Sequence, residues 1–125
     1  MKGIVWNCRK VDWSYPDSGG RHNIEDCLLA YICCEKNDGI DQTKEVIRRI
    51  KQLNKRRYLK NNLVIFPFAH LSDQLLDDDQ AKILIENIAV TLQKSMEVSI
   101  MGFNMRKEVK IHLLPENGDV SYFCY

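Results

Sequence analysis

One histidine follows an apolar run that ends in a proline, an arrangement typical of ligand-binding positions. Residues 63–66 (Leu-Val-Ile-Phe) favour a buried strand, and Pro67 should end it because proline has no amide hydrogen for a strand ladder. The pattern therefore places His70 just beyond a strand end. Ligands of layered α/β domains bind there, because the sheet positions the polar groups of the following loop. A histidine that only hydrogen-bonds its own loop backbone fits the same pattern.

A second candidate feature is a predicted amphipathic helix across residues 39–58, whose outer side is strongly basic. The basic residues are Lys44, Arg48, Arg49, Lys51, Lys55, Arg56 and Arg57, with Glu45 as the single acid between Lys44 and Lys60. In a chain of formal net charge +1, this group makes a local positive field that can follow an RNA phosphate backbone. The candidate RNA contacts are Arg48, Lys51, Lys55 and Arg56. An ordinary solvated helix face is the alternative.

No motif for a metal or a cofactor is apparent. The acidic triplet at residues 77–79 precedes a second helical pattern, where capping explains it better than cation binding, because no EF-hand spacing is in register. The cysteines include no C-x-x-C pair, and Gly19-Gly20 fits neither phosphate-binding glycine fingerprint. We therefore expect a site without a metal or a cofactor.

The composition limits the class of protein. A chain of 125 residues that is 45% hydrophobic and 28% charged is typical of one globular domain, here residues 1–125. No apolar run approaches the roughly 20 residues of a membrane span, and the first residues lack the apolar core of a signal peptide. We expect a cytoplasmic protein with no membrane contact.

Hydrophobic periodicity predicts the order of the elements that position these residues. Strands are expected at residues 2–11, 24–34, 63–67, 97–103, 109–114 and 120–125, and helices at residues 39–58 and 77–92. Residues 15–20 form a turn-rich loop, and Asn117-Gly118 indicates a hairpin with residues 120–125 as the return strand. The predicted fold class is a single layered α/β domain with a mixed sheet and two main helices.

Several segments resemble, in their order along the chain and in the lengths of the helical stretches, the archaeal-type threonyl-tRNA synthetase N-terminal editing domain, a relative of D-aminoacyl-tRNA deacylases. Residues 63–75 (LVIFPFAHLSDQL) are similar to the family signature VYPFAHLSS-L. Residues 24–36 (IEDCLLAYICCEK) resemble the second strand of the family, and residues 102–111 (GFNMRKEVKI) resemble its PFGYYKAFKI segment. Only P-F-A-H-L-S is specific as a motif, but the resemblance covers nearly the whole chain and implies a D-aminoacyl-tRNA deacylase-like fold.

The resemblance implies a proofreading esterase that removes serine from the tRNA meant for threonine. Ester hydrolysis needs a positioned water and donors where negative charge develops, and the family is thought to use the terminal 2′-hydroxyl of the tRNA rather than a covalent nucleophile. The implied partners are the aminoacylated tRNA end, a second copy in a homodimer and the catalytic part of the synthetase, in cis or in trans. The residues implied by position are Lys107 and His70 for catalysis, and Pro67, Ala69, Phe103 and Arg106 for substrate binding.

The sequence also departs from the family. Asn7-Cys8-Arg9 replaces a His-Ser-Asp run, Met105-Arg106 replaces an aromatic pair, and a later glutamate has no secure counterpart. These changes leave open which amino acid is removed and whether hydrolysis is retained. The alternatives are a non-catalytic tRNA-binding or dimerisation module and, less favoured, a small-metabolite enzyme. The apolar end at residues 120–125 favours a domain cut from a longer synthetase.

Overall fold

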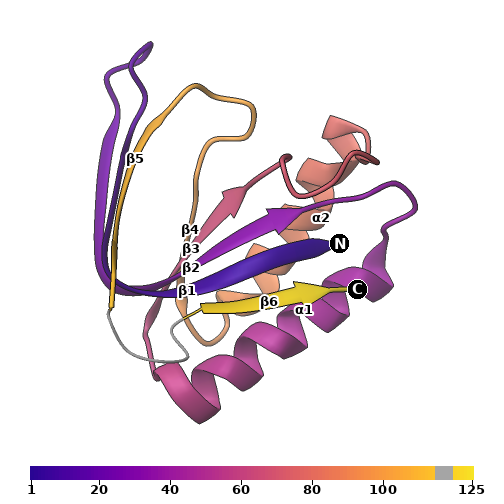
Figure 1. The fold of residues 1–125 in the computed structure, drawn as a ribbon, viewed down its shortest axis with the longest axis horizontal. Helices are drawn as coiled ribbons and strands as arrows, with labels where there is room; N and C mark the ends of the chain where they lie inside the picture. Colours follow the sequence, from indigo (N-terminus) through magenta and orange to yellow (C-terminus); the bar gives the residue numbers. More distant parts are fainter. Residues whose placement is uncertain (115–119) are drawn as a thin grey trace.

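A long antiparallel hairpin forms the centre of the sheet in the computed structural model, which describes residues 1–114 and 120–125 (Figure 1). Its strands are β1 (Lys2–Ser14) and β2 (Arg21–Cys33). Residues 15–20 close the hairpin as a tight turn, in which the Tyr15 amide donates to the Gly20 carbonyl at 2.9 Å. Gly19 has a φ of +74°, a conformation that glycine adopts without strain. The predicted loop is thus the tip of the hairpin.

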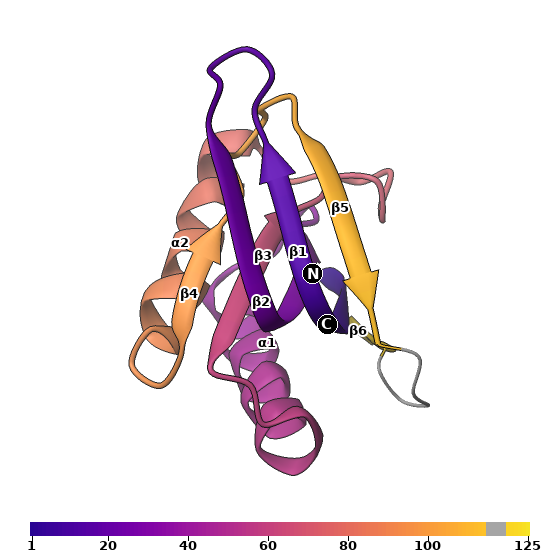
Figure 2. The same ribbon diagram turned by 90° about the vertical axis from the view of Figure 1, so that its left-hand side faces the viewer.

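The remaining strands extend the sheet on both sides of the hairpin. On one side, β3 (Asn62–Pro67) pairs parallel with β2, and β4 (Glu97–Ile100) pairs parallel with β3. On the other side, β5 (Glu108–Leu113) and β6 (Val120–Cys124) pair antiparallel with β1. The path β4-β3-β2-β1-β5 is visible in Figure 2. The sheet is therefore mixed, as predicted.

The predicted hairpin between the last two strands is wrong. Both β5 and β6 are antiparallel to β1, so they run in the same direction along different halves of that strand. In the register, Trp13 lies opposite Val109 and Gly3 lies opposite Phe123. Residue alternation identifies a strand but not its partner. The Asn117-Gly118 turn itself lies outside the described residues.

The two predicted main helices are present, and both cover one face of the sheet. They are α1 (Ile40–Leu53), which continues into one π-helical turn, η1 (Asn54–Tyr58), and α2 (Asp78–Leu92). Their apolar sides share a core with alternate residues of β2 and β3, including Ile50, Ile88, Leu28 and Leu63. Each of these side chains is at most 1% exposed, and burial of one such side chain contributes roughly 1.5–3 kcal/mol. The apolar residues at helical spacing in the sequence are therefore those buried in this shared core.

A second, smaller core lies on the opposite face of the sheet. The hairpin bends along its length, so that its outer half and β5 turn away from the direction of the inner half (Figure 1). A register shift between Cys8 and Lys10 marks a bulge, which is a common cause of such a bend. Beyond it, Val11 and Trp13 pack in the same cluster as Val64 and Met101. The start of the segment that follows β4 therefore packs against the bent hairpin.

Candidate functional site

A cavity of about 310 Å³ opens where β3 ends. Four segments line it: the end of β2, the end of β3 with the next loop, the first half of α2, and the segment that follows β4. The predicted site residues Pro67, Ala69, His70, Phe103 and Lys107 all lie in its lining. The fold thus brings together residues that are far apart in the sequence.

Hydrogen bonds to the end of β2 and to the chain that follows it fix the loop carrying Ala69 and His70. The Phe68 amide donates to the Ile32 carbonyl at 3.0 Å, and the Leu76 amide donates to the Cys34 carbonyl at 3.2 Å. Between these points, the Ser72 hydroxyl donates to Glu35 Oε2 at 2.8 Å. The loop is therefore attached at both ends and at one side chain within it.

Glu35 carries an ionised carboxylate beneath this loop. Burial raises the pKa of Glu35, but hydrogen bonds from Ser72, Lys2 and the amino group of Met1 outweigh it, so that the pKa lies below its usual value. The Lys2 ammonium lies 3.3 Å from Glu35 Oε2. The charged form of Glu35 is therefore the one that holds Ser72.

His70 lies at the rim of the cavity, at the end of a chain of aromatic contacts. Its side chain is exposed, and its ring meets the Phe68 ring edge-on at a centroid distance of 5.3 Å. Phe68 in turn contacts Tyr31, at 4.7 Å. The imidazole is held on one side by an aromatic ring and is open to solvent on the other, so it can donate or accept a hydrogen bond from a ligand.

Lys107 presents a partly buried ammonium group to the same cavity. Its Nζ donates to the Met105 carbonyl at 2.7 Å and lies 5.2 Å from the centroid of the Phe66 ring. Burial lowers the pKa of Lys107. An ammonium has three donors, so the bond to Met105 leaves two for a ligand. Lys107 can therefore supply positive charge and hydrogen bonds inside the cavity.

Cys34 also lines the cavity, but its thiol does not suit nucleophilic chemistry. Burial raises the pKa of Cys34 to about 12. Because the thiolate is the reactive form of cysteine, the side chain is inert near neutral pH. This agrees with a reaction that needs no covalent protein nucleophile.

Asp78 is a lining residue that sequence reasoning did not assign to the site. Its Oδ2 accepts a hydrogen bond from Asn104 Nδ2 at 2.6 Å, which links the first turn of α2 to the segment after β4. The acidic triplet was explained by helix capping, and α2 does begin at Asp78, although the Asp77 side chain makes no capping bond. The charges of Asp78 and Asp79 favour the first turn through the helix dipole. Nothing in the sequence pairs Asp78 with Asn104.

Arg106 does not line the cavity. It is 79% exposed, and its guanidinium lies 3.5 Å from Asp17 in the turn of the β1–β2 hairpin. Asn7, Cys8 and Arg9, where the family pattern differs, are also absent from the cavity lining. A substrate contact by Arg106 remains a prediction, which requires the side chain to leave Asp17.

The four candidate RNA contacts share a depression on α1 and η1. Arg48, Lys51, Lys55 and Arg56 line it together with Gln52, and none of these residues lines the cavity. Arg48 is paired with Glu45 on the same helix. Arg49, from the same basic side, instead donates to the Ser121 hydroxyl at 3.0 Å and so joins α1 to β6. The basic surface is thus a separate feature from the cavity.

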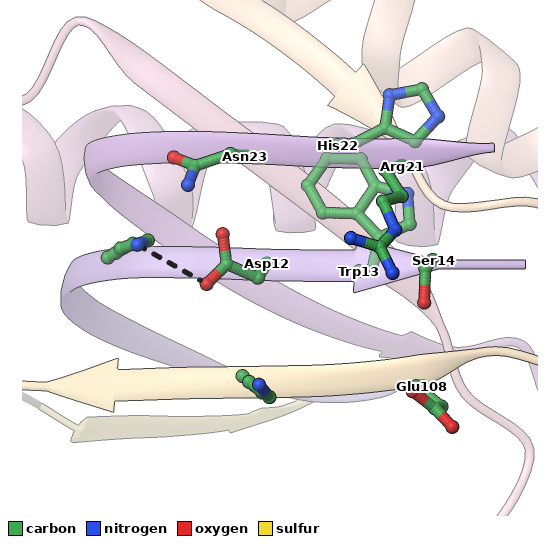
Figure 3. A pocket seen from close by; sticks show the side chains of 9 residues that line it. Asp12, Trp13, Ser14, Arg21, His22, Asn23 and Glu108 are labelled. Atoms are coloured by element: carbon green, nitrogen blue, oxygen red, sulfur yellow. Dashed lines mark ion pairs between the residues drawn. The ribbon is translucent and has the colours of Figure 1, made fainter.

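A further depression of about 400 Å³ lies on the outer half of the hairpin and β5 (Figure 3). Its lining residues are Lys10, Asp12, Trp13, Ser14, Arg21, His22, Asn23, Glu108 and Lys110. Positive and negative side chains alternate here, and Lys10 lies 3.5 Å from Asp12. This mixture is typical of a solvated sheet face. Within residues 1–114 and 120–125, no group of three or more His, Cys, Asp or Glu side chains is placed to hold a metal ion.

The fold belongs to the D-aminoacyl-tRNA deacylase-like class. A structure of the c-Myc DNA unwinding element binding protein superimposes with a TM-score of 0.79, covering 100% of this chain and 99% of that chain at 11% identity. A probable eukaryotic D-amino acid tRNA deacylase gives a TM-score of 0.68, covering 98% and 97% at 8% identity. At these identities the likeness concerns the fold alone. The predicted fold class is confirmed.

The sequence places the chain more narrowly within this class. Residues 3–117 match the Archaea-specific editing domain of threonyl-tRNA synthetase, and the chain belongs to this family. A threonine–tRNA ligase of Cenarchaeum symbiosum is 34% identical over 134 residues, which cover 96% of this chain and 21% of the ligase. A threonine–tRNA ligase of Methanococcus vannielii is 32% identical over 95 residues, covering 70% and 14%. The chain thus spans about a fifth or less of these relatives.

These comparisons confirm the resemblance found in the sequence. Membership of an editing-domain family, together with the deacylase-like fold, supports a proofreading role and a hydrolase in general terms. No helix in the described part of the chain is long and apolar enough to cross a membrane.

Proposed function

We propose that this domain hydrolyses the ester bond of mischarged aminoacyl-tRNA and, more narrowly, removes serine from the tRNA for threonine. The observation that carries this proposal is the cavity at the end of β3. It gathers Phe103, His70 and the partly buried ammonium of Lys107 on the segments that match the editing family. The aromatic residues Phe66 and Phe68 add apolar surface to the lining of the cavity.

The reaction assigns one role to each group. The terminal adenosine packs against Phe103, and the ester carbonyl lies near Lys107. A water molecule attacks the carbonyl carbon, negative charge develops on the carbonyl oxygen, and the Lys107 ammonium stabilises it. The bond to the ribose oxygen then breaks, the proton given up by the attacking water ends on that oxygen, and the RNA leaves with a hydroxyl group while the free amino acid is released.

His70 and the terminal ribose complete this scheme. The exposed imidazole of His70 is available to hydrogen-bond the attacking water or the amino-acid side chain. The ribose hydroxyl beside the ester orients the water, so that no covalent enzyme intermediate is required. Cys34, the thiol in the lining, stays protonated and takes no part.

Selectivity for serine over threonine rests on one methyl group. A pocket discriminates a single methyl or methylene by roughly 1–3 kcal/mol, which corresponds to about 10- to 200-fold in rate. We assign this discrimination to the wall formed by Pro67 and Ala69, where the backbone follows the end of β3. The family provides the precedent for serine.

The basic depression on α1 and η1 binds a part of the tRNA that lies outside the cavity. Arg48, Lys51, Lys55 and Arg56 offer charges of one sign along one helix, which suits a phosphate backbone rather than a base-specific contact. We further propose that the domain acts in the cytoplasm as a homodimer, with the catalytic part of threonyl-tRNA synthetase in cis or in trans.

Incubation with mischarged tRNA tests the proposal. Under single-turnover conditions, the domain should release serine from threonine tRNA that carries serine. It should hydrolyse the same tRNA carrying threonine at least about tenfold more slowly. Binding of both tRNAs without hydrolysis would contradict the enzymatic proposal and favour a tRNA-binding module. Cleavage of free amino-acid esters at the same rate would point instead to a small-metabolite enzyme.

A further inference from the structure

The segment between β4 and β5 carries two of the proposed site residues, Phe103 and Lys107, but it belongs to no helix or strand. Its geometry must therefore come from contacts with other parts of the chain. At its start, the Met101 amide donates to the Ile65 carbonyl at 2.9 Å, which continues the pairing of β4 with β3. From Gly102 onward, support has to come from outside the sheet.

The side chain of Tyr15, at the tip of the β1–β2 hairpin, supplies this support. The Gly102 amide donates to the Tyr15 hydroxyl oxygen at 2.7 Å. The Trp13 ring N–H donates to the same oxygen at 3.1 Å. Trp13 is 3% exposed and Tyr15 is 9% exposed, so the bond between them is buried, and the bond to Gly102 is partly buried. One buried oxygen thus joins the hairpin to the first residue of the site segment.

Neighbouring rings keep Tyr15 in place. The Trp13 ring stacks on His22 with a centroid distance of 4.9 Å and an interplanar angle of 14°, and His22 meets the Tyr15 ring edge-on at 5.8 Å. A Cβ atom on Gly102 would lie 3.2 Å from Tyr15 Cε1 and 2.4 Å from Met105 Sδ. Glycine at this position leaves room for the close approach of the tyrosine ring and the Met105 side chain to the segment.

Two other side-chain contacts of the segment are exposed, whereas Phe103 packs, partly buried, against the main core. Asn104 bonds to Asp78 at the rim of the cavity, and Arg106 lies 3.5 Å from Asp17 in the hairpin turn. Exposed ion pairs contribute little, because solvent screens them and both side chains lose freedom. The Tyr15 bond is better shielded from solvent than these two contacts, and its loss should loosen the segment near Gly102 first.

We infer that Tyr15 is a positioning residue for the editing site. Its hydroxyl holds Gly102, and through it the segment that aims Phe103 and Lys107 into the cavity. This inference rests on the proposed function. The long hairpin then supports the site, because a residue at its tip contacts the segment between β4 and β5.

The test compares Tyr15→Phe with Tyr122→Phe as the matched control. Tyr122 lies on β6, is 57% exposed and does not line the cavity. For Y15F we expect the single-turnover rate on seryl-tRNA to fall about tenfold, while the dissociation constant for the tRNA changes less than twofold. Y122F should keep the wild-type rate.

Hydrogen exchange of the Gly102 amide gives a readout that does not depend on activity. In Y15F this amide should exchange at least about tenfold faster, whereas the Ile50 amide inside α1 should be unchanged. A Y15F protein with wild-type rate and wild-type Gly102 exchange would overturn the inference and leave the proposed function intact. An equal rise in exchange at Gly102 and Ile50 would also overturn it, because it would show general destabilisation.

If the wild-type protein does not hydrolyse seryl-tRNA, the proposed function fails, and a catalytic positioning role for Tyr15 fails with it. Gly102 exchange in Y15F would then still decide whether the hydroxyl holds the segment. If Y15F does not fold, Trp13→Phe removes the second donor but keeps an aromatic ring. The same direction of change in Gly102 exchange is expected, and no change would overturn the inference.

Discussion

The Lys107 ammonium lies 5.2 Å from the centroid of the Phe66 ring, which joins a loop residue to the end of the central parallel strand. The ring covers part of the ammonium and removes water from it, and this burial lowers the pKa of Lys107. The charge is thereby placed where it acts most strongly, because electrostatic interactions increase as water is excluded.

This burial predicts a pH dependence. The hydrolysis rate should fall as the pH rises through the folded pKa of Lys107, which lies below the usual 10.5, because deprotonation removes the charge that stabilises the oxyanion. Below that pKa the ammonium is fully present. Rate profiles between about pH 7 and 11 measure the midpoint, after correction for spontaneous ester hydrolysis. A Lys107→Arg variant that retains activity should lose this decline, since a guanidinium stays charged. An identical decline in both proteins would contradict the assignment.

The basic depression predicts a salt-dependent affinity. Changing Arg48, Lys51, Lys55 and Arg56 together to glutamate should weaken tRNA binding at least about tenfold and reduce the slope of log affinity against log salt, by roughly one for each lost phosphate contact. Lys10→Glu with Lys110→Glu, in the depression on the outer half of the hairpin and β5, is the control for a basic-to-acidic change elsewhere. Equal weakening by both sets, although the control changes half as many charges, would contradict a specific role of this depression in tRNA binding.

The β6 edge predicts self-association. Val120 and Tyr122 are exposed on a strand whose described pairing is with β1, and an exposed apolar edge is a surface for another chain. Light scattering at micromolar concentration should give the mass of a dimer, and Tyr122→Glu should shift it toward the monomer. A monomeric mass for the wild type at all concentrations would remove the prediction.

The contact between β1 and β6 predicts a cost for a small substitution. A Cβ atom on Gly3 would lie 2.3 Å from both the Phe123 ring and the Tyr31 carbonyl oxygen. The Tyr31 oxygen belongs to the backbone, so Gly3→Ala should reduce the free energy of unfolding by about 1–3 kcal/mol. Denaturant titration measures it, and Gly39→Ala, whose Cβ would meet nothing within 4 Å, is the control. Equal stability of the two variants would contradict the packing described here.

Hydrophobic periodicity was sufficient to predict the helices and strands, but not which strands pair with each other. The apolar run before Pro67 predicted β3, and the spacing of Ile47, Ile50 and Leu53 predicted α1, because each pattern records a buried face. The pairing of β6 with β1 depends on contacts between distant residues, which a local pattern does not contain. The hairpin expected after residue 114 therefore failed, although its strands exist.

The site was predicted in two different ways. His70 followed from the strand end, whereas Phe103 and Lys107 came from the family resemblance, since a lysine near the start of a strand is ordinary by itself. The contact of Asp78 with Asn104 and the support by Tyr15 were missed. Both are single side-chain bonds between segments far apart in the sequence, and no spacing rule predicts them.

The central claim is that Lys107 stabilises the transition state of aminoacyl-ester hydrolysis. Single-turnover deacylation of seryl-tRNA by the wild type and by Lys107→Met, beside a filter-binding titration of each protein, tests it most directly. We predict a rate about 100-fold lower for K107M with nearly unchanged tRNA affinity, because the charge is needed only when the oxyanion forms. Equal rates for the two proteins, or no hydrolysis by the wild type, would contradict the claim.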